Sequence, residues 1–453
     1  MKEKYFNIII AGAGVFIALI IGAAQVYIAI EQKRLADQQA RIASLQGETQ
    51  ALSSWLPFLK DEDANVRLMA IIALERIGTQ GVVAPLVIAL SDTHESIRKR
   101  AGSALSRIAT DDTVDIIVGI LENQDPNTRE AAINTLVSLG YERIPMLMTA
   151  LGKAPPSVRP YVERAIGRIL LNERVMKRIG ALQSHELTMG RPKIVVALVG
   201  GGVDISLPDI RNALIDETNY TDDYGEPAIS TALAARLIVG GVDSDIVGVA
   251  PGVKLISERV LGSGGGSSET VAEGVRHAAR QGARIIYLEL GSTFYNEELQ
   301  KAINEAHSSG CIIVAAAGNS NSDTEEFPAA MDNVVAVAAT DTDDKKATYS
   351  SFGVWVDITA PGNPVGENEF KNSELSVMKG TSFSGSLVAG AAALVWSIDP
   401  NFTNQQVEDI LINTAKNIDD INPKYKKNLG SGRIDVLKAV NKALEIAKSS
   451  HSQ

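Results

Sequence analysis

The chain has 453 residues, more than one hydrophobic core usually serves, so we expect two or more domains. Hydrophobic residues make up 45% of it and charged residues 21%, which excludes both a wholly disordered chain and a polytopic membrane protein. The net charge of -11, with no basic block, argues against nucleic acid as a partner. The single cysteine, Cys311, excludes an intrachain disulfide.

The first feature along the chain is an uncharged apolar segment from Ile8 to Ile30. At about 1.5 Å per residue, a helix of this length crosses a hydrocarbon core of roughly 30 Å, so residues 1–30 are predicted to form a transmembrane anchor. The alternative is a signal peptide ending near Ala24, but its apolar core is usually only about 7–15 residues long. A short cationic N-terminal tail usually stays inside, so we expect a bacterial inner-membrane protein with its soluble part outside the cytoplasm.

Residues 31–50 are predicted to form a helical stalk, because they are rich in Gln, Ala, Arg and Leu and contain no proline. Apolar residues follow heptad spacing at Leu35, Ile42, Leu45 and Leu52. Two heptads do not distinguish a coiled coil from a single solvated helix, so both remain open.

An internal repeat occupies residues 51–180. Four segments align without gaps: Leu59–Gly78, Leu90–Ala109, Leu121–Gly140 and Leu151–Leu170. An arginine recurs at the same place in each, at Arg67, Arg98, Arg129 and Arg159. The regular spacing of these arginines along the chain, together with the helical spacing of apolar residues within each segment, predicts stacked helical hairpins. The segments resemble HEAT-like repeats, which implies an α-solenoid with a concave face for a protein partner. We expect the arginines to bond within and between repeats, and a row of ligand-binding arginines is the alternative.

A second domain is predicted over residues 191–447, after a charged helical connector at Leu171–Gly190, because the composition changes there to Gly, Ala, Val and Ile. Apolar runs predict strands at Ile194–Val199, Ile285–Leu290, Ile312–Ala317 and Val334–Ala338. Helical stretches alternate with them, for example Glu269–Gln281 and Asn296–Ser308. This alternation is typical of βαβ units with a parallel sheet.

Two short motifs in this domain carry chemistry. The run Gly380–Ser384 precedes an Ala-rich helix and places Ser382 at its start, where backbone N–H groups favour a developing negative charge. Asn319 follows a buried strand and offers an amide that can donate to an oxyanion. By itself, a Gly-Thr-Ser run is also a common helix cap.

Further motifs occur in order along the domain: Gly248–Pro251, Phe327–Ala330, Ala347–Gly353, Ala360–Gly362 and Leu429–Asp435. With them, the chain from about Lys193 to Ala447 resembles the subtilisin-like serine proteases. The resemblance implies an α/β fold with a doubly wound parallel sheet, a nucleophile at Ser382 and an oxyanion donor at Asn319. It also implies that an extended peptide lies between two edges, which here contain Gly264 and Gly265 on one side and Leu288, Glu289, Leu290 and Gly291 on the other.

The chain departs from the family's pattern at two of its three catalytic positions. The family's first strand ends in the catalytic Asp, which a Ser/Thr-Gly pair follows, but here the strand ends in Gly200. Asp204 does not fit this position, because no Ser/Thr-Gly pair follows it. The family's catalytic His falls on Ile229. A serine hydroxyl is a poor nucleophile without an adjacent base, so Ser382 is not expected to be activated.

These features leave three hypotheses for function. The preferred one is a membrane-anchored pseudoprotease that binds a protein or an extended peptide as a scaffold. It would need no cofactor and no catalytic metal, and the one bound ion considered is structural calcium. The second is a serine endopeptidase in which an unusual carboxylate, Glu226 or Glu289, assists Ser382. The third is a structural wall of a larger membrane complex without a peptide cleft.

Overall fold

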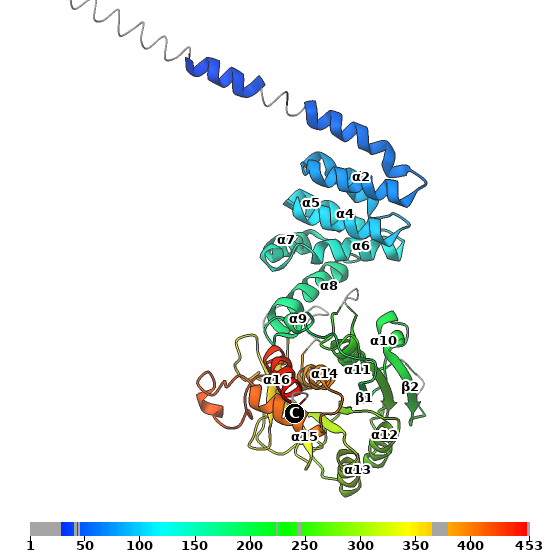
Figure 1. Ribbon diagram of the computed structural model, residues 1–453, viewed down its shortest axis with the longest axis vertical. Coiled ribbons are helices and arrows are strands. Elements are labelled where there is room, and N and C mark those ends of the chain that lie inside the picture. Colours follow the sequence, from blue (N-terminus) through cyan, green and yellow to red (C-terminus); the bar gives the residue numbers. More distant parts are fainter. Residues whose placement is uncertain are drawn as a thin grey trace, which may run out of the picture. The chain divides into compact units, whose positions relative to one another are not determined.

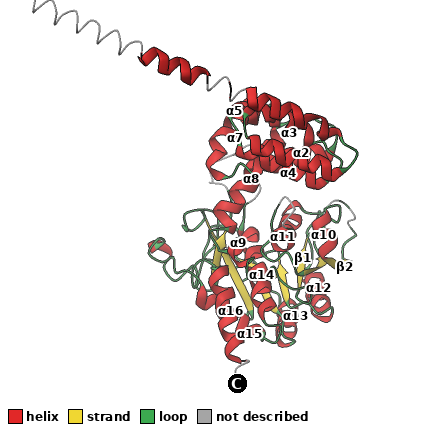
Figure 2. Cartoon of the chain, turned by 45° about the horizontal axis from the view of Figure 1, so that its top comes forward, coloured by secondary structure: helices red, strands yellow, loops and turns green. Residues whose placement is uncertain are grey.

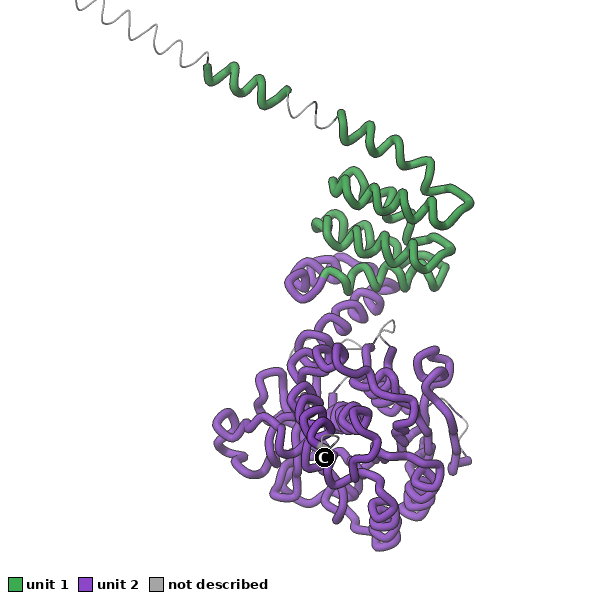
Figure 3. The backbone as a smooth tube through the Cα atoms, viewed as in Figure 1, with its two compact units in different colours: residues 1–139 green, residues 140–453 purple. Residues whose placement is uncertain are grey.

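The computed structural model of the protein describes residues 29–39, 43, 46–222, 225, 227–241, 246–364 and 379–450. The chain divides into two compact units, Met1–Leu139 and Gly140–Gln453 (Figure 3). The predicted transmembrane segment at 8–30 lies outside the described residues except for its last two. Residues 31–39, 43 and 46–50 of the predicted stalk are helical, as the sequence indicates.

The first unit contains a stack of short helices (Figure 1). Its elements are η1 (Leu56–Lys60), α2 (Ala64–Ile77), η2 (Gln80–Val82), α3 (Val83–Ala89), α4 (Glu95–Arg107), α5 (Asp111–Ile120) and α6 (Pro126–Val137). Apolar residues at helical spacing form its core, and Ile71, Leu74 and Leu105 are fully buried. The helices α4 and α6 approach closely at Gly102, where an added Cβ atom would lie 2.5 Å from Thr135 Oγ1.

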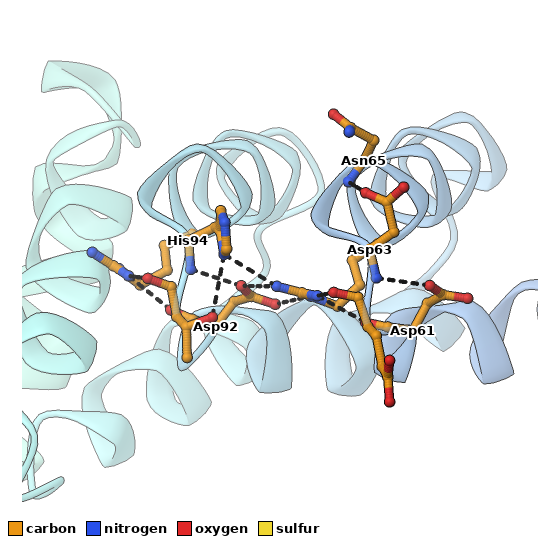
Figure 4. Close-up of polar contacts among 9 residues, drawn as sticks. Asp61, Asp63, Asn65, Asp92 and His94 are labelled. Carbon is orange, nitrogen blue, oxygen red and sulfur yellow. Dashed lines mark hydrogen bonds and ion pairs between the residues drawn. The ribbon is translucent and has the colours of Figure 1, made fainter.

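The recurrent arginines of the repeats bind loop carbonyl groups. Arg67 donates to the carbonyls of Asp61 and Glu62 and forms a 2.7 Å ion pair with Asp92, which lies in the loop before α4 (Figure 4). Arg98 and Arg129 each donate to two carbonyls five and six residues earlier in the chain. The expectation that they bond within and between repeats is therefore confirmed in this unit.

The second unit begins with helices that lead into the sheet domain. They are η3 (Tyr141–Arg143), α7 (Ile144–Lys153), α8 (Arg159–Leu170), η4 (Leu171–Met176, a π-helix) and α9 (Ala181–Ser184). The prediction of a charged connector at Leu171–Gly190 is wrong in one respect, because Leu171, Val175 and Ile179 are fully buried in the main core of this unit. Their spacing of four residues places them on one face of the helical segment, which packs as part of the domain.

A parallel sheet of seven strands forms the centre of the second unit, in the order β2-β3-β1-β4-β5-β6-β7. Its strands are yellow in Figure 2, with helices in red around them. The strands are β1 (Val195–Gly200), β2 (Leu214–Asn219), β3 (Lys254–Arg259), β4 (Ile285–Leu288), β5 (Ile312–Ala316), β6 (Val334–Thr340) and β7 (Ile358–Pro361). All residues of β1, β4, β5 and β6 are buried, as expected for central strands with helices on both faces.

Helices cover both faces of this sheet. They are α10 (Pro208–Ala213), α11 (Ile229–Val239), α12 (Ser268–Arg280), α13 (Glu297–Ser308), α14 (Thr381–Ile398), α15 (Asn404–Thr414), η6 (Pro423–Tyr425) and α16 (Val436–Ser450). The helices α12 and α13 pack on one face, and α11, α14 and α16 share the core on the other face (Figure 1). The predicted doubly wound α/β architecture is confirmed.

One described helix, α14, is long and apolar enough to cross a membrane. Most of it is buried in the core of the second unit, where Leu387, Leu394 and Trp396 have no exposed surface. The apolar composition of α14 is therefore explained by its place as a central core helix.

Candidate active site

The carboxyl ends of the central strands and the start of α14 meet at one edge of the sheet, where ligands bind in open α/β folds. Gly200 is the last residue of β1, and Glu289 directly follows β4. Asn319 lies three residues after β5, and Ser382 is the second residue of α14. The folding of the sheet thus brings together four of the positions that the sequence singles out.

Ser382 and Asn319 both lie close to Gly380. A Cβ atom added at Gly380 would lie 3.2 Å from Ser382 Oγ and 3.6 Å from Asn319 Nδ2. Thr381 fixes the direction of the Asn319 amide, because its backbone N–H donates to Asn319 Oδ1 at 2.9 Å and its hydroxyl donates to the same atom. The Nδ2 group is therefore left to donate beside Ser382, at the positive end of the α14 dipole.

The backbone carbonyl group of Ser382 anchors this residue to the sheet. The hydroxyl of Tyr287 on β4 donates to the carbonyl of Ser382 at 2.6 Å, which ties the first turn of α14 to the centre of the sheet. Within the described part of the chain, the Oγ atom of Ser382 has no hydrogen-bond partner. A nucleophilic serine is normally paired with a base through this atom.

Gly200 has the side chain of Glu289 beside it. The two residues end neighbouring strands, and the backbone N–H of Glu289 donates to Val199 at 3.0 Å. A Cβ atom at position 200 would lie 3.4 Å from Glu289 Oε2 and 3.4 Å from Thr231 Oγ1. The carboxylate of Glu289 therefore lies next to the place of the missing side chain at position 200.

The Glu289 side chain is only 7% exposed, and its Oε2 atom has no hydrogen-bond partner among the described residues. Burial raises the pKa of the Glu289 carboxyl to about 7, and hydrogen bonds from the side chains of Thr231 and Ser230 oppose that shift. The sequence predicts Glu289 in one edge of the peptide cleft, and in the structure its side chain turns inward to the end of β1.

Ile229 is the first residue of α11, and its neighbours contact the end of β1. The N–H of Ala228 donates to the carbonyl of Gly201, and the N–H of Gly201 donates to Thr231 Oγ1. The helix start at Ile229 is thus close to Gly200. The motifs predict that positions 200, 229 and 382 form one site, and the structure places the first two close together.

Comparisons with known proteins agree with this geometry. Residues 191–435 match the model of the subtilase family, which is more than half of the chain. The chain belongs to the subtilase family. Residues 33–106 and 83–167 match HEAT repeats, so the helical units before the sheet are identified as well.

Several proteases of this family are similar to the chain. Thermitase of Thermoactinomyces vulgaris is 34% identical over 270 residues, which cover 58% of this chain and 94% of thermitase. Subtilisin Savinase of Lederbergia lenta is 32% identical over 252 residues, covering 54% of this chain and 92% of Savinase. Among solved structures, the prenylagaramide maturation protease PagA is 27% identical, with a TM-score of 0.51, and the match covers 58% of this chain and 98% of PagA.

The subtilase pattern needs a histidine at the site, yet the described histidines are bound elsewhere. His277 contacts Glu258 at 2.8 Å, His185 contacts the carbonyl of Val249 at 2.9 Å, and His307 is 3.8 Å from Glu408. His94 lies in the first unit beside Arg67. His451 and Glu226, the second carboxylate named as a possible base, lie outside the described residues.

The two predicted edges of the subtilase peptide cleft differ. Gly262 and Gly265 exchange two backbone hydrogen bonds of 3.0 Å, and Gly265 has a φ of 89°, so this edge is a closed turn in which Gly264 faces open space. On the other edge, Leu290 and Gly291 have no backbone hydrogen bond to any described residue. Among the described residues, the backbone groups of Leu290 and Gly291 continue from β4 without a partner, whereas those of Gly264 lie at the tip of a turn.

A carboxylate that the sequence prediction missed lies at this second edge. Glu326 Oε1 accepts hydrogen bonds from the hydroxyls of Ser320 and Ser351. Its Oε2 atom lies 4.0 Å from a Cβ atom built at Gly291 and would overlap one built at Gly318. Glu326 thus lies between the ends of β4 and β5. The one available signal was its place directly before the motif Phe327–Ala330.

Members of the subtilase family act without a cofactor, and structural calcium is optional in them. Calcium binding by this chain stays a prediction.

Proposed function

We propose that the subtilase domain of this chain binds an extended polypeptide and does not cleave it by the family's mechanism. The observation that carries this proposal is the pair of replacements at one site, Gly200 and Ile229, beside a serine whose Oγ has no described partner. Neither replacement can accept the proton of Ser382 or orient a base. The oxyanion donors that remain would retain only about 10³–10⁴-fold over the rate in water, which is negligible for a protease.

Backbone pairing is the proposed mode of binding. The N–H and C=O groups of Leu290 and Gly291, which have no backbone partner among the described residues, form an edge to which an extended peptide can add as a strand. Main-chain hydrogen bonds of this kind supply affinity without regard to sequence. Selection must then come from the side chains next to the edge.

Glu326 is the proposed source of that selection. Two serine hydroxyls hold its Oε1 atom, so the carboxylate has a fixed direction and presents Oε2 to the space between Gly291 and Gly318. Both glycines lack side chains that would fill this space. A lysine or arginine of the bound peptide would form a charge-assisted hydrogen bond there, so the proposed ligand is an extended peptide with a basic side chain.

A peptide-library screen with the full-length chain tests this function. We expect enrichment of lysine and arginine at one position of the bound peptides, equal binding by Ser382→Ala, and loss of the basic preference in Glu326→Gln. The matched control is Glu325→Gln, which removes the same charge from an exposed neighbour and should leave the preference intact. The absence of any binder, or a basic preference unchanged in Glu326→Gln, would favour a structural wall without a peptide cleft.

A second candidate function is hydrolysis in which Glu289 serves as the base. It is favoured by one observation, the pKa of about 7 of a buried carboxyl next to Gly200, which is suited to general base catalysis near neutral pH. It predicts peptide cleavage that rises with pH through about 7 and is lost in both Glu289→Gln and Ser382→Ala. Cleavage with these two dependences would replace the proposed function.

The membrane anchor at residues 8–30 belongs to the same proposal. It would hold the repeats and the peptide-binding domain at the surface of a bacterial inner membrane, outside the cytoplasm, where the HEAT repeats bind a protein partner. Treatment of spheroplasts with an external protease should then degrade the soluble part, and protection of that part would place it in the cytoplasm.

A further inference from the structure

Three side chains that can bind a metal ion meet on the α12 face of the sheet. Asp216 comes from the edge strand β2, Glu258 from β3 and His277 from α12. One ligand atom from each lies within 4.8 Å of the others. Ser382 begins α14, which packs on the opposite face of the sheet, so this group is separate from the candidate active site.

The register of the sheet explains why these residues converge. Asp216 pairs with Ile256 and Thr218 pairs with Glu258 across two parallel strands, so the side chains of all four lie on the same face. Ile256 packs in the core formed with α12. Asp216 and Glu258 therefore both point toward this helix, which presents His277 above them.

The hydrogen bonds of the two carboxylates are incomplete. Glu258 has no exposed surface, and its Oε1 atom lies 2.8 Å from His277 Nδ1. Glu258 Oε2 and Asp216 Oδ2 are both buried, and neither has a hydrogen-bond partner within the described ranges of the chain. A buried carboxylate oxygen without a partner is costly, so two of them in one cluster indicate that a ligand is missing from the group.

His277 is oriented as a ligand. Its Nε2 atom lies 3.3 Å from the side-chain amide of Gln281, whose oxygen can accept the Nε2–H after the amide is turned. That bond would fix the proton on Nε2 and leave the lone pair on Nδ1, which faces Glu258. The imidazole is 24% exposed, so a hydrated ion can reach it from solvent.

We propose that Asp216, Glu258 and His277 bind a divalent transition-metal cation of the zinc type. One imidazole and two carboxylates suit zinc, whereas calcium and magnesium take oxygen ligands. Zinc bonds of about 2.0–2.2 Å at tetrahedral angles place the ligand atoms about 3.4 Å from one another. Side chains whose ligand atoms already lie within 4.8 Å of one another reach this arrangement by small movements. The ion displaces the proton shared by His277 and Glu258 to solvent, and it joins the edge strand β2 to β3 and α12.

Metal titration of the full-length chain tests the proposal. The protein is stripped with a chelator and titrated with zinc chloride by calorimetry, and its melting temperature is followed in parallel. We expect one zinc ion per chain and a rise in the melting temperature on binding. Asp216→Asn and His277→Gln should each weaken zinc binding at least tenfold. His307→Gln, which removes a histidine from the neighbouring helix α13, should leave it unchanged.

Asp216→Asn keeps the test decisive if His277→Gln does not fold, because Asp216 lies on an edge strand and is only partly buried. The absence of saturable zinc binding would overturn the proposal. Zinc binding that both variants retain would also overturn it. Calcium binding as strong as zinc binding, and lost in the same variants, would overturn the assignment to zinc. Peptide binding at the other site is not involved, so either proposal can fail without the other.

Discussion

The two halves of the candidate active site differ in what they keep of the family's pattern. On the α14 side, Ser382 and Asn319 have the residue types that the family's pattern predicts for a nucleophile and an oxyanion donor, and they lie close together. On the β1 side, Gly200 and Ile229 stand where that pattern predicts the acid and the base, and the inward-turned Glu289 lies next to Gly200. The same sheet edge thus carries one intact half and one altered half.

The residues of the intact half also hold the fold together. Thr381 Oγ1 accepts the N–H of Gly318 and donates to Asn319, and the carbonyl of Ser382 accepts the hydroxyl of Tyr287. Loss of these bonds would leave buried polar groups without partners. In a protease, the catalytic acid and base serve the reaction and not the stability of the fold. Gly200 and Ile229 at these positions are therefore compatible with a stable fold, because Glu289 and its hydrogen-bond partners fill the space beside Gly200. On the proposed function, the comparison teaches that structural bonds would preserve one half of a site after loss of its reaction.

The largest expected effect comes from rebuilding the altered half. We expect the triple variant Gly200→Asp, Ile229→His, Glu289→Ser to hydrolyse a chromogenic peptide at least about 10²-fold faster than the double variant that retains Glu289. An Asp at position 200 would lie against the Glu289 carboxylate, and two adjacent carboxylates cannot both stay ionised. Losing the orienting carboxylate in this reaction class costs about 10⁴ in kcat. Ser382→Ala in the triple variant is the control, and equal rates of the double and triple variants would contradict this role of Glu289.

The next effect concerns the stability of the altered half. The folded-state pKa of Glu289, about 7, lies above its ordinary value of 4.5, so the folded state binds the proton more tightly than the unfolded state. Glu289 therefore favours folding most below about pH 4.5, and this contribution is lost as the pH rises through about 7, by up to about 3 kcal/mol. Glu289→Gln should raise the free energy of unfolding relative to the wild type at about pH 8 and change it little at about pH 4.

Chemical denaturation at both pH values measures this difference, with Glu325→Gln as a control for the loss of an exposed charge. A Glu289→Gln variant with the same pH dependence of stability as the wild type would show that the carboxyl of Glu289 titrates near its ordinary pKa.

The smallest effect tests whether the intact half is structural. Thr381→Val should lower the free energy of unfolding by about 1–2 kcal/mol, because the N–H of Gly318 loses its acceptor and Asn319 loses a donor. Ser382→Ala should stay within about 0.5 kcal/mol of the wild type, since its Oγ atom has no partner among the residues that the structure describes. Equal losses in the two variants would argue against a separate structural role for Thr381.

Much of the fold could be predicted from the sequence, because the central strands are short apolar runs and the repeats have a constant period. The prediction missed β2, β3 and β7 for physical reasons. The edge strand β2 is half exposed and polar, and β3 ends in the polar Ser257 and the charged Glu258 and Arg259, which obscure an apolar pattern. The strand β7 has only four residues.

The candidate site was predicted less completely. Motifs identified Ser382, Asn319, Gly200 and Ile229 by position along the chain. The direction of the Glu289 side chain could not be read from the sequence, because it depends on the space that the absent side chain at position 200 leaves. Glu326 was missed because its role depends on the distance between the ends of two strands.

The most direct test of the central claim is labelling of the full-length chain with a fluorophosphonate probe, which reacts with an activated serine. With no imidazole at Ile229, we expect labelling of the wild type no stronger than that of Ser382→Ala, and no hydrolysis of unfolded protein. The triple variant rebuilt at Gly200, Ile229 and Glu289 serves as the positive control. Labelling of the wild type that is abolished by Ser382→Ala would contradict the account and show that this serine is activated.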